Sequence, residues 1–201
     1  MATTFTFEID LRAALTAGAD LFEYPGPVAA AAVAAVLAGP TAPPAWLAAA
    51  SPEVQARVRS FAEAVAPLSQ GAWEEIYTHT FDLQAEQTLN LGHQVFGEDW
   101  KRSTLLIELQ AMMPRYGVHT GSELPDHLVW LLRLLAAAPA DDSEVQDLRG
   151  HCLLPGVRAL TGKLAEDNPY TALLHALTLL LMEPVAAGTA ASNSSGAGAR
   201  P

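Results

Sequence analysis

The sequence predicts an all-α fold, a single compact bundle of several helices, and three observations lead to that prediction. Hydrophobic residues make up 50% of the 201-residue chain, which is ample for a core. Apolar residues recur at helical spacing, whereas no segment alternates with the period of two typical of half-buried strands. Helix start and stop signals separate the apolar segments. We therefore expect one helical domain over residues 1–183.

Proline- and glycine-rich stops divide the first part of the chain into helices. The expected segments are about 7–22, about 27–38, one beginning at Ser51-Pro52-Glu53, one from Gly71 to Gly97 with a kink near Asp82, and about 100–115. The order serine, proline, acid supplies a cap, a favourable first residue and a carboxylate in the first turn.

The stretch 121–139, GSELPDHLVWLLRLLAAAP, contains the most apolar helical run. Leucines at positions 128, 131, 132 and 135 share one helical face, and Trp130 and Leu134 cover much of the rest. This helix should therefore be central and buried on several sides. Proline is tolerated in a first turn and aspartate is favoured there by the helix dipole, so we expect the helix to begin at Pro125-Asp126.

The last helices begin at recognisable caps. Asp141 and Glu144 resemble a capping box, and Pro155 must interrupt or restart the helix that follows. Asn168-Pro169 begins the final helix. Residues 184–201 are mostly small and polar, so we expect them to form a disordered C-terminal tail.

Charge and cysteine content limit the possible partners. Acidic residues outnumber basic residues by 22 to 11, and the formal net charge is −11. Nucleic acid and anionic lipid would be repelled by such a surface, whereas a basic peptide would be attracted.

Cys152 is the sole cysteine, and no signal sequence is evident. No apolar run reaches the roughly 18 residues that span a bilayer. We expect a cytoplasmic protein without membrane insertion.

The sequence contains little that is typical of an enzyme, a metal site or a nucleotide site. Asp126 and His127 are neighbours, which point about 100° apart on a helix, so they make a poor acid–base pair. Cys152 lies in an apolar setting, and no G-x-S-x-G motif supplies a nucleophile. His151-Cys152 lacks chelating spacing, and no phosphate-binding loop occurs. We expect neither catalysis nor a cofactor nor a metal.

Three separated motifs resemble the NarJ family, the assembly chaperones of respiratory nitrate reductase within the wider TorD/DmsD group. They are Tyr77–Asp82 (YTHTFD), Glu123–Leu128 (ELPDHL) and Asn168–Tyr170 (NPY), and Leu21–Pro25 lies where the family has its early L-x-Y-P helix end. The resemblance covers about residues 7–183. The sequence departs from the family at Gln84, Glu86, Val129 and Arg133, which leaves the client open between a nitrate reductase and a related molybdopterin oxidoreductase.

The resemblance implies an all-helical chaperone that performs no chemistry. Such proteins bind the N-terminal segment of a molybdopterin oxidoreductase catalytic subunit, a twin-arginine leader or its remnant, until the molybdenum cofactor is inserted. A basic, amphipathic peptide needs an apolar groove and nearby negative charge. The peptide-binding residues that we expect are Tyr77, Phe81, Asp82, Glu123, Pro125, Asp126 and His127. The aromatic rings would line the groove, the carboxylates would meet the basic residues, and His127 would titrate near pH 6–7.

Each of these residues also has a structural interpretation. Tyr77 and Phe81 fit a plain core stripe, Asp82 an N-cap after a kink, Asp126 a helix start, and His127 a core histidine bonded to a backbone carbonyl. A generic helical adaptor for another protein partner is the alternative function. Whether the chain forms a homodimer, for instance by exchanging helices, is left open.

Overall fold

The computed structural model describes residues 10–38 and 43–183. Within these ranges all regular structure is helical and no strand occurs, which confirms the all-α prediction. Residues 1–9, 39–42 and 184–201 lie outside the described part, and so does the expected C-terminal tail.

The helices follow one another with short connections. The α-helices are α1 (Leu11–Leu21), α2 (Pro27–Leu37), α3 (Ala45–Ala49), α4 (Pro52–Val65), α5 (Gln70–Phe81), α6 (Leu91–Phe96), α7 (Trp100–Met112), α8 (Leu128–Ala137), α9 (Ser143–Leu148), α10 (Leu154–Thr161) and α11 (Pro169–Met182). Short 3₁₀ turns occur at η1 (Ala85–Gln87) and η2 (Met113–Tyr116), and a π-helical turn, η3 (Arg149–Leu153), joins α9 to α10.

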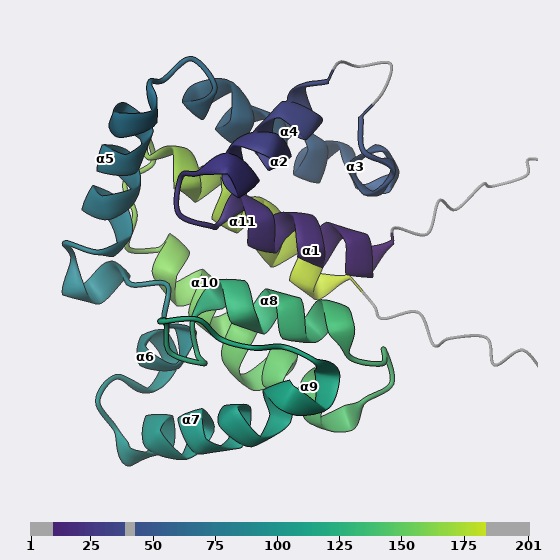
Figure 1. The fold of residues 1–201 in the computed structure, drawn as a ribbon, viewed down its shortest axis with the longest axis vertical. Helices are drawn as coiled ribbons and strands as arrows, with labels where there is room; N and C mark the ends of the chain where they lie inside the picture. Colours follow the sequence, from purple (N-terminus) through teal and green to yellow (C-terminus); the bar gives the residue numbers. More distant parts are fainter. Residues whose placement is uncertain (1–9, 39–42, 184–201) are drawn as a thin grey trace, which may run out of the picture.

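The helices form two groups that meet along α1, α8 and α10. In Figure 1, α1, α2, α4 and α5 occupy the upper part with α11 behind them, and α6, α7 and α9 occupy the lower part. Helix α4 packs on α11, α8 packs on α1, and α10 contacts both α11 and α6. Leu128, Leu131, Leu132 and Leu134 are all fully buried, as the apolar run predicts for a central α8.

Tyr170 of the NPY motif lies at the centre of an aromatic cluster in the upper group. Its ring is fully buried, and its centroid lies 4.9 Å from that of Phe81, 5.0 Å from that of Phe61 and 5.9 Å from that of Tyr77. Trp73 Nε1 donates a hydrogen bond of 2.9 Å to the Tyr170 hydroxyl. Ring packing in this cluster therefore joins α4, α5 and α11. The hydrogen bond between Trp73 and Tyr170 also satisfies both polar groups in this apolar core.

Several expected caps are present. Ser51 Oγ accepts a hydrogen bond from Val54 N, as the start signal of α4 requires. Asn168 Oδ1 accepts from Tyr170 N at 2.9 Å and caps α11. Pro155 lies in the first turn of α10, where its missing N–H costs nothing, so the helix restarts there after η3.

Three expected boundaries were wrong. The segment from Gly71 to Gly97 is not one kinked helix, because α5 ends at Phe81 with Asp82 as its C-cap and two shorter elements follow. Asp142, not Asp141, caps α9 through a hydrogen bond from Val145 N to Asp142 Oδ1. Helix α8 begins at Leu128, and Pro125 and Asp126 precede it in a turn.

Replacement of Tyr170 by Phe tests the aromatic cluster. Loss of the hydroxyl leaves the buried Trp73 Nε1 without its acceptor, and we expect the free energy of unfolding to fall by about 1–2 kcal/mol in urea denaturation. Tyr24→Phe is the matched control, because Tyr24 is half-exposed, and it should change stability by less than about 0.5 kcal/mol. Equal stability of Tyr170→Phe and the unmodified protein would show that the contact contributes nothing.

Candidate functional site

The ELPDHL segment is held in place by backbone pairing with the start of α6. Leu91 N donates to the Asp126 carbonyl, and Leu128 N donates to the Leu89 carbonyl, both at 2.8 Å. The two bonds form an isolated antiparallel bridge between Asn90 and His127. Because His127 is extended in this bridge, α8 cannot begin before Leu128.

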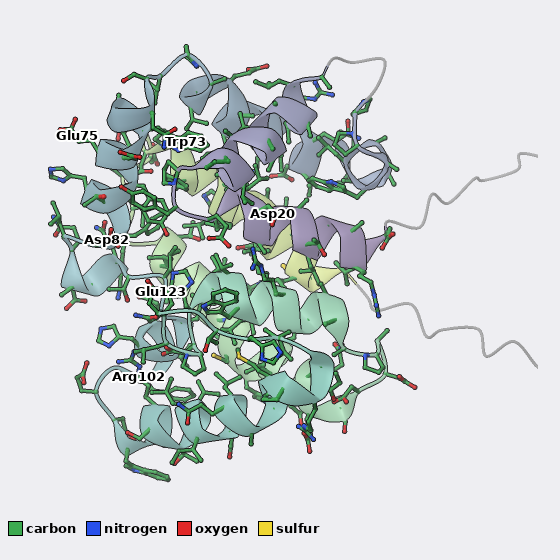
Figure 2. The ribbon with its side chains drawn as sticks, viewed as in Figure 1. Asp20, Trp73, Glu75, Asp82, Arg102 and Glu123 are labelled. Atoms are coloured by element: carbon green, nitrogen blue, oxygen red, sulfur yellow. The ribbon has the colours of Figure 1, made fainter. Side chains whose placement is uncertain are left out.

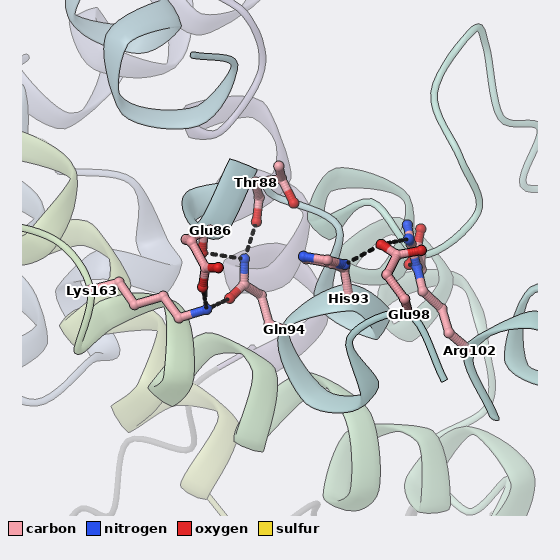
Figure 3. A network of polar contacts seen from close by, with 8 residues as sticks. Glu86, Thr88, His93, Gln94, Glu98, Arg102 and Lys163 are labelled. Carbon is pink, nitrogen blue, oxygen red and sulfur yellow. Dashed lines mark hydrogen bonds and ion pairs between the residues drawn. The ribbon is translucent and has the colours of Figure 1, made fainter. Parts of the chain in front are cut away.

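Asp126 lies beneath this bridge in a buried ion pair. Its side chain has no exposed surface, and its Oδ2 accepts a hydrogen bond of 2.9 Å from Arg102 Nε of α7. Glu98 lies 3.8 Å from Arg102 and 3.2 Å from His93, so the network reaches the surface on this side, as Figure 3 shows. A Cβ on Gly92 would lie 2.6 Å from Asp126 Oδ2, so only glycine leaves room for the carboxylate.

The expectation that Asp126 faces a groove was therefore wrong. A carboxylate with no exposed surface and a cationic partner of its own has no access to a peptide in this conformation. Pro125 is also buried. Asp126 connects the segment before α8 to α6 and α7, and the peptide contact expected of Asp126 and Pro125 has no geometric basis here.

His127 serves as the N-cap of α8. Its Nδ1 accepts a hydrogen bond of 3.4 Å from Val129 N. Burial lowers the pKa of the imidazole from 6.5 to about 4, because the protein interior disfavours the charged form. The expected titration near pH 6–7 was wrong for this reason, and His127 is neutral at physiological pH.

Tyr77 and Phe81 belong to the core and do not line an open groove. Their side chains are only 6% and 2% exposed. Tyr77 is covered by Tyr24, whose ring packs edge-on at 5.3 Å between centroids and is 50% exposed. Solvent therefore reaches the ring of Tyr24, in the segment Leu21–Pro25 (LFEYP) at the end of α1.

Asp82 and Glu123, in contrast, are at the surface. Both are exposed, although they lie in different segments, at the end of α5 and in the loop before α8 (Figure 2). Burial chiefly raises the pKa of the Tyr77 phenol, and the charges of Tyr170, Asp82, Glu123 and Glu23 raise it further. The Asp82 and Glu123 carboxylates therefore act on the same phenol.

The charges and apolar side chains at this place form a surface suited to a cationic, apolar ligand. Glu23 is paired with Arg133 at 2.6 Å, but within residues 10–38 and 43–183 neither Asp82 nor Glu123 has an ion-pair partner. An exposed leucine follows each carboxylate in the sequence: Leu83, after Asp82, is 63% exposed, and Leu124, after Glu123, is 45% exposed. We call Tyr24, Asp82, Leu83, Glu123 and Leu124 the acidic–apolar surface.

The loop that carries Asp82 is fixed at its far end. Lys163 Nζ donates to Gln94 Oε1 at 2.9 Å and lies 3.5 Å from Glu86 Oε2, and Gln94 Nε2 donates to the Thr88 carbonyl at 2.8 Å (Figure 3). These contacts attach η1 and α6 to the end of α10. Burial raises the Asp82 pKa, and a hydrogen bond with the Thr78 side chain opposes that rise.

A hollow lies between α7 and the α9–η3 segment, where no site residue was expected. Its volume is about 830 Å³, and Leu105, Leu109, Leu148 and Cys152 are among its apolar lining residues. Burial raises the pKa of the Cys152 thiol to about 12, so the thiol stays neutral and unreactive. The Arg115–Glu144 ion pair connects the two walls of the hollow.

A change of pH tests the position of His127. As the pH falls, His127 is protonated in the unfolded chain at a higher pH than in the folded protein. The stability that neutral His127 contributes is therefore complete above pH 6.5 and is lost as the pH falls toward 4. The loss should be on the order of 2–3 kcal/mol at pH 4, since one pKa unit corresponds to about 1.4 kcal/mol. His127→Asn keeps a capping side chain and removes the titration, so its unfolding free energy should depend less on pH over this interval. Identical pH dependence of the two proteins would disprove the burial effect.

Within the described ranges, no three His, Cys, Asp or Glu side chains gather as a metal site would require. Among the helices of the described residues, none combines the length and apolarity needed to cross a membrane. No protein-family model matches the chain, and a search of curated proteins gives no match.

Proposed function

We propose that the protein is an assembly chaperone that binds the N-terminal segment of a molybdopterin oxidoreductase catalytic subunit and holds it until the molybdenum cofactor is inserted. The bound segment is a twin-arginine leader or its remnant, basic and then apolar, and a nitrate reductase is the first candidate client. The resemblance of the three sequence motifs supports the choice of client. The acidic–apolar surface supports the binding of a basic and apolar peptide. The protein acts by binding, in the cytoplasm, and performs no reaction.

The observation that carries the proposal is that Asp82 and Glu123, exposed in different segments, both raise the pKa of the same Tyr77 phenol. Two carboxylates without ion-pair partners in the described part of the chain lie near one phenol, beside three exposed apolar side chains. The basic residues of a leader peptide would pair with the carboxylates, and its apolar residues would cover Tyr24, Leu83 and Leu124. The net charge of −11 would raise the association rate of a basic peptide.

The buried motif residues contribute by positioning the exposed ones. Glu123 and Leu124 precede Asp126 by three and two residues, and the bridge at Asn90–His127 fixes where this short segment lies. His127 N donates a hydrogen bond of 3.0 Å to the Leu124 carbonyl and closes the turn. In this proposal the ELPDHL motif presents its first two residues to a ligand, and the contacts of Asp126 and His127 hold the segment in place.

Calorimetric titration with a synthetic leader peptide tests the proposal. The peptide is the N-terminal segment of the molybdopterin oxidoreductase subunit from the same cell. Replacing Asp82 by Asn and Glu123 by Gln together should weaken binding about tenfold or more, because each exposed pair contributes up to about 1 kcal/mol. The matched control is Glu75→Gln, which removes one exposed charge from α5 at a place away from this surface (Figure 2) and should leave the affinity unchanged.

The outcomes separate this function from a generic adaptor. A peptide in which the arginines are replaced by glutamine should bind both proteins equally weakly if the carboxylates recognise those arginines. No binding of the leader to the unmodified protein, or equal affinity of the double variant, would contradict the proposal. Co-purification from the native cell should recover the molybdopterin oxidoreductase subunit, and recovery of an unrelated protein alone would favour the adaptor.

A further inference from the structure

Helix α7 has an exposed apolar stripe that the proposed function does not use. Trp100, Thr104, Ile107 and Ala111 follow one another at intervals of four, three and four residues, which places them on one helical face. Trp100 is 70% and Ile107 is 69% exposed, and the other two are exposed as well. Figure 1 shows α7 at the lower edge of the described part of the chain, where none of the labelled helices covers its outer side.

This stripe is separate from the face that holds α7 to the protein. Leu109 and Met112 are buried, Leu105 packs against the core, and Arg102 reaches Asp126. The inner side of α7 is therefore satisfied by the fold. The four–three–four spacing of this second, largely apolar face matches one seam of a coiled coil, where another helix would pack.

The charges beside the stripe identify that helix. Lys101 and Glu108 flank the seam on the same side, seven residues apart, and neither has an ion pair within residues 10–38 and 43–183. In an antiparallel pair of identical helices, residues at this flanking position face their equivalents across the seam. Lys101 of one copy then meets Glu108 of the other, and a two-fold axis makes the contact twice.

The side-chain sizes agree with the same arrangement. With the axis midway between Leu105 and Leu106, the large Trp100 lies opposite the small Ala111, and Thr104 lies opposite Ile107. The opposite flank then pairs Ser103 with Gln110, which are both exposed and uncharged. The helix is therefore complementary to itself in this arrangement. Large residues lie opposite small ones, one flank pairs opposite charges, and no like charges meet.

We propose that two copies of this chain associate through α7, antiparallel about a two-fold axis. The partner helix would also cover the side of the hollow between α7 and α9, since Trp100, Lys101, Glu108 and Ala111 contribute to its lining. One helix per protomer makes a small interface, so we expect a dissociation constant in the micromolar range, on the order of 10–100 µM. The interface shares no residue with the acidic–apolar surface, so each proposal stands or fails independently.

Sedimentation velocity over a concentration series, with exchange of Lys101 and Glu108, tests the dimer. The unmodified protein should shift from monomer to dimer with rising concentration. Lys101→Glu alone, or Glu108→Lys alone, places like charges opposite each other twice and should raise the dissociation constant about tenfold or more. The double variant restores opposite charges and should return to within about threefold of the unmodified value.

Two further variants separate the interface from folding and from net charge. Trp100→Ala removes a mostly exposed side chain, so the monomer should stay folded in circular dichroism while the dimer is lost. Glu75→Lys changes the net charge by the same amount as Glu108→Lys but lies on α5, and it should leave dimerisation unchanged. A monomer at every concentration, or a double variant as weak as the single ones, would overturn the proposal.

Discussion

The buried ion pair between Asp126 and Arg102 is the contact on which the arrangement of the lower helices depends. It joins the segment before α8 to α7, and the backbone bridge at Asn90–His127 adds α6 to the same point. Burying two charges has a large desolvation cost, which their attraction and hydrogen bonds offset only in good geometry. Gly92 makes that geometry possible because any larger residue would occupy the space of the carboxylate. Once formed, the pair is costly to break, so it fixes one arrangement of three helices.

This constraint divides the recognisable motifs into two kinds of residues. Tyr77, Phe81, Asp126 and Tyr170 are buried, and they define the core and its connections. Asp82 and Glu123 lie beside them in sequence and face solvent. A motif can therefore mark a binding surface without touching the ligand itself, because its buried members determine where the exposed members lie. In our account, the core places on one surface two carboxylates that come from separate segments, the end of α5 and the loop before α8.

The helical class, the central α8 and most helix starts could be predicted from the sequence, because caps and apolar periodicity are local signals. The start of α8 could not, since the bridge to Asn90 is a contact across 37 positions that overrides the local preference for helix at Pro125-Asp126. Arg102 was missed for the same reason: nothing in the first turn of α7 marks it as the partner of Asp126. The exposure of Tyr24 and Leu83 likewise depends on packing between elements distant in sequence. The pKa of His127 could not be foreseen, because its burial follows from that same bridge.

The central claim is that Asp126 positions the surface and does not bind the ligand, and one variant tests it directly. Asp126→Asn keeps the shape of the side chain but removes its charge, so the account predicts a fall in the free energy of unfolding of about 3 kcal/mol. At a temperature where this variant is still folded, its calorimetric affinity for the leader peptide should stay within about threefold of the unmodified protein, which is a difference below about 0.7 kcal/mol. Unchanged stability together with a tenfold or greater loss of affinity would contradict the account and would make Asp126 a direct contact.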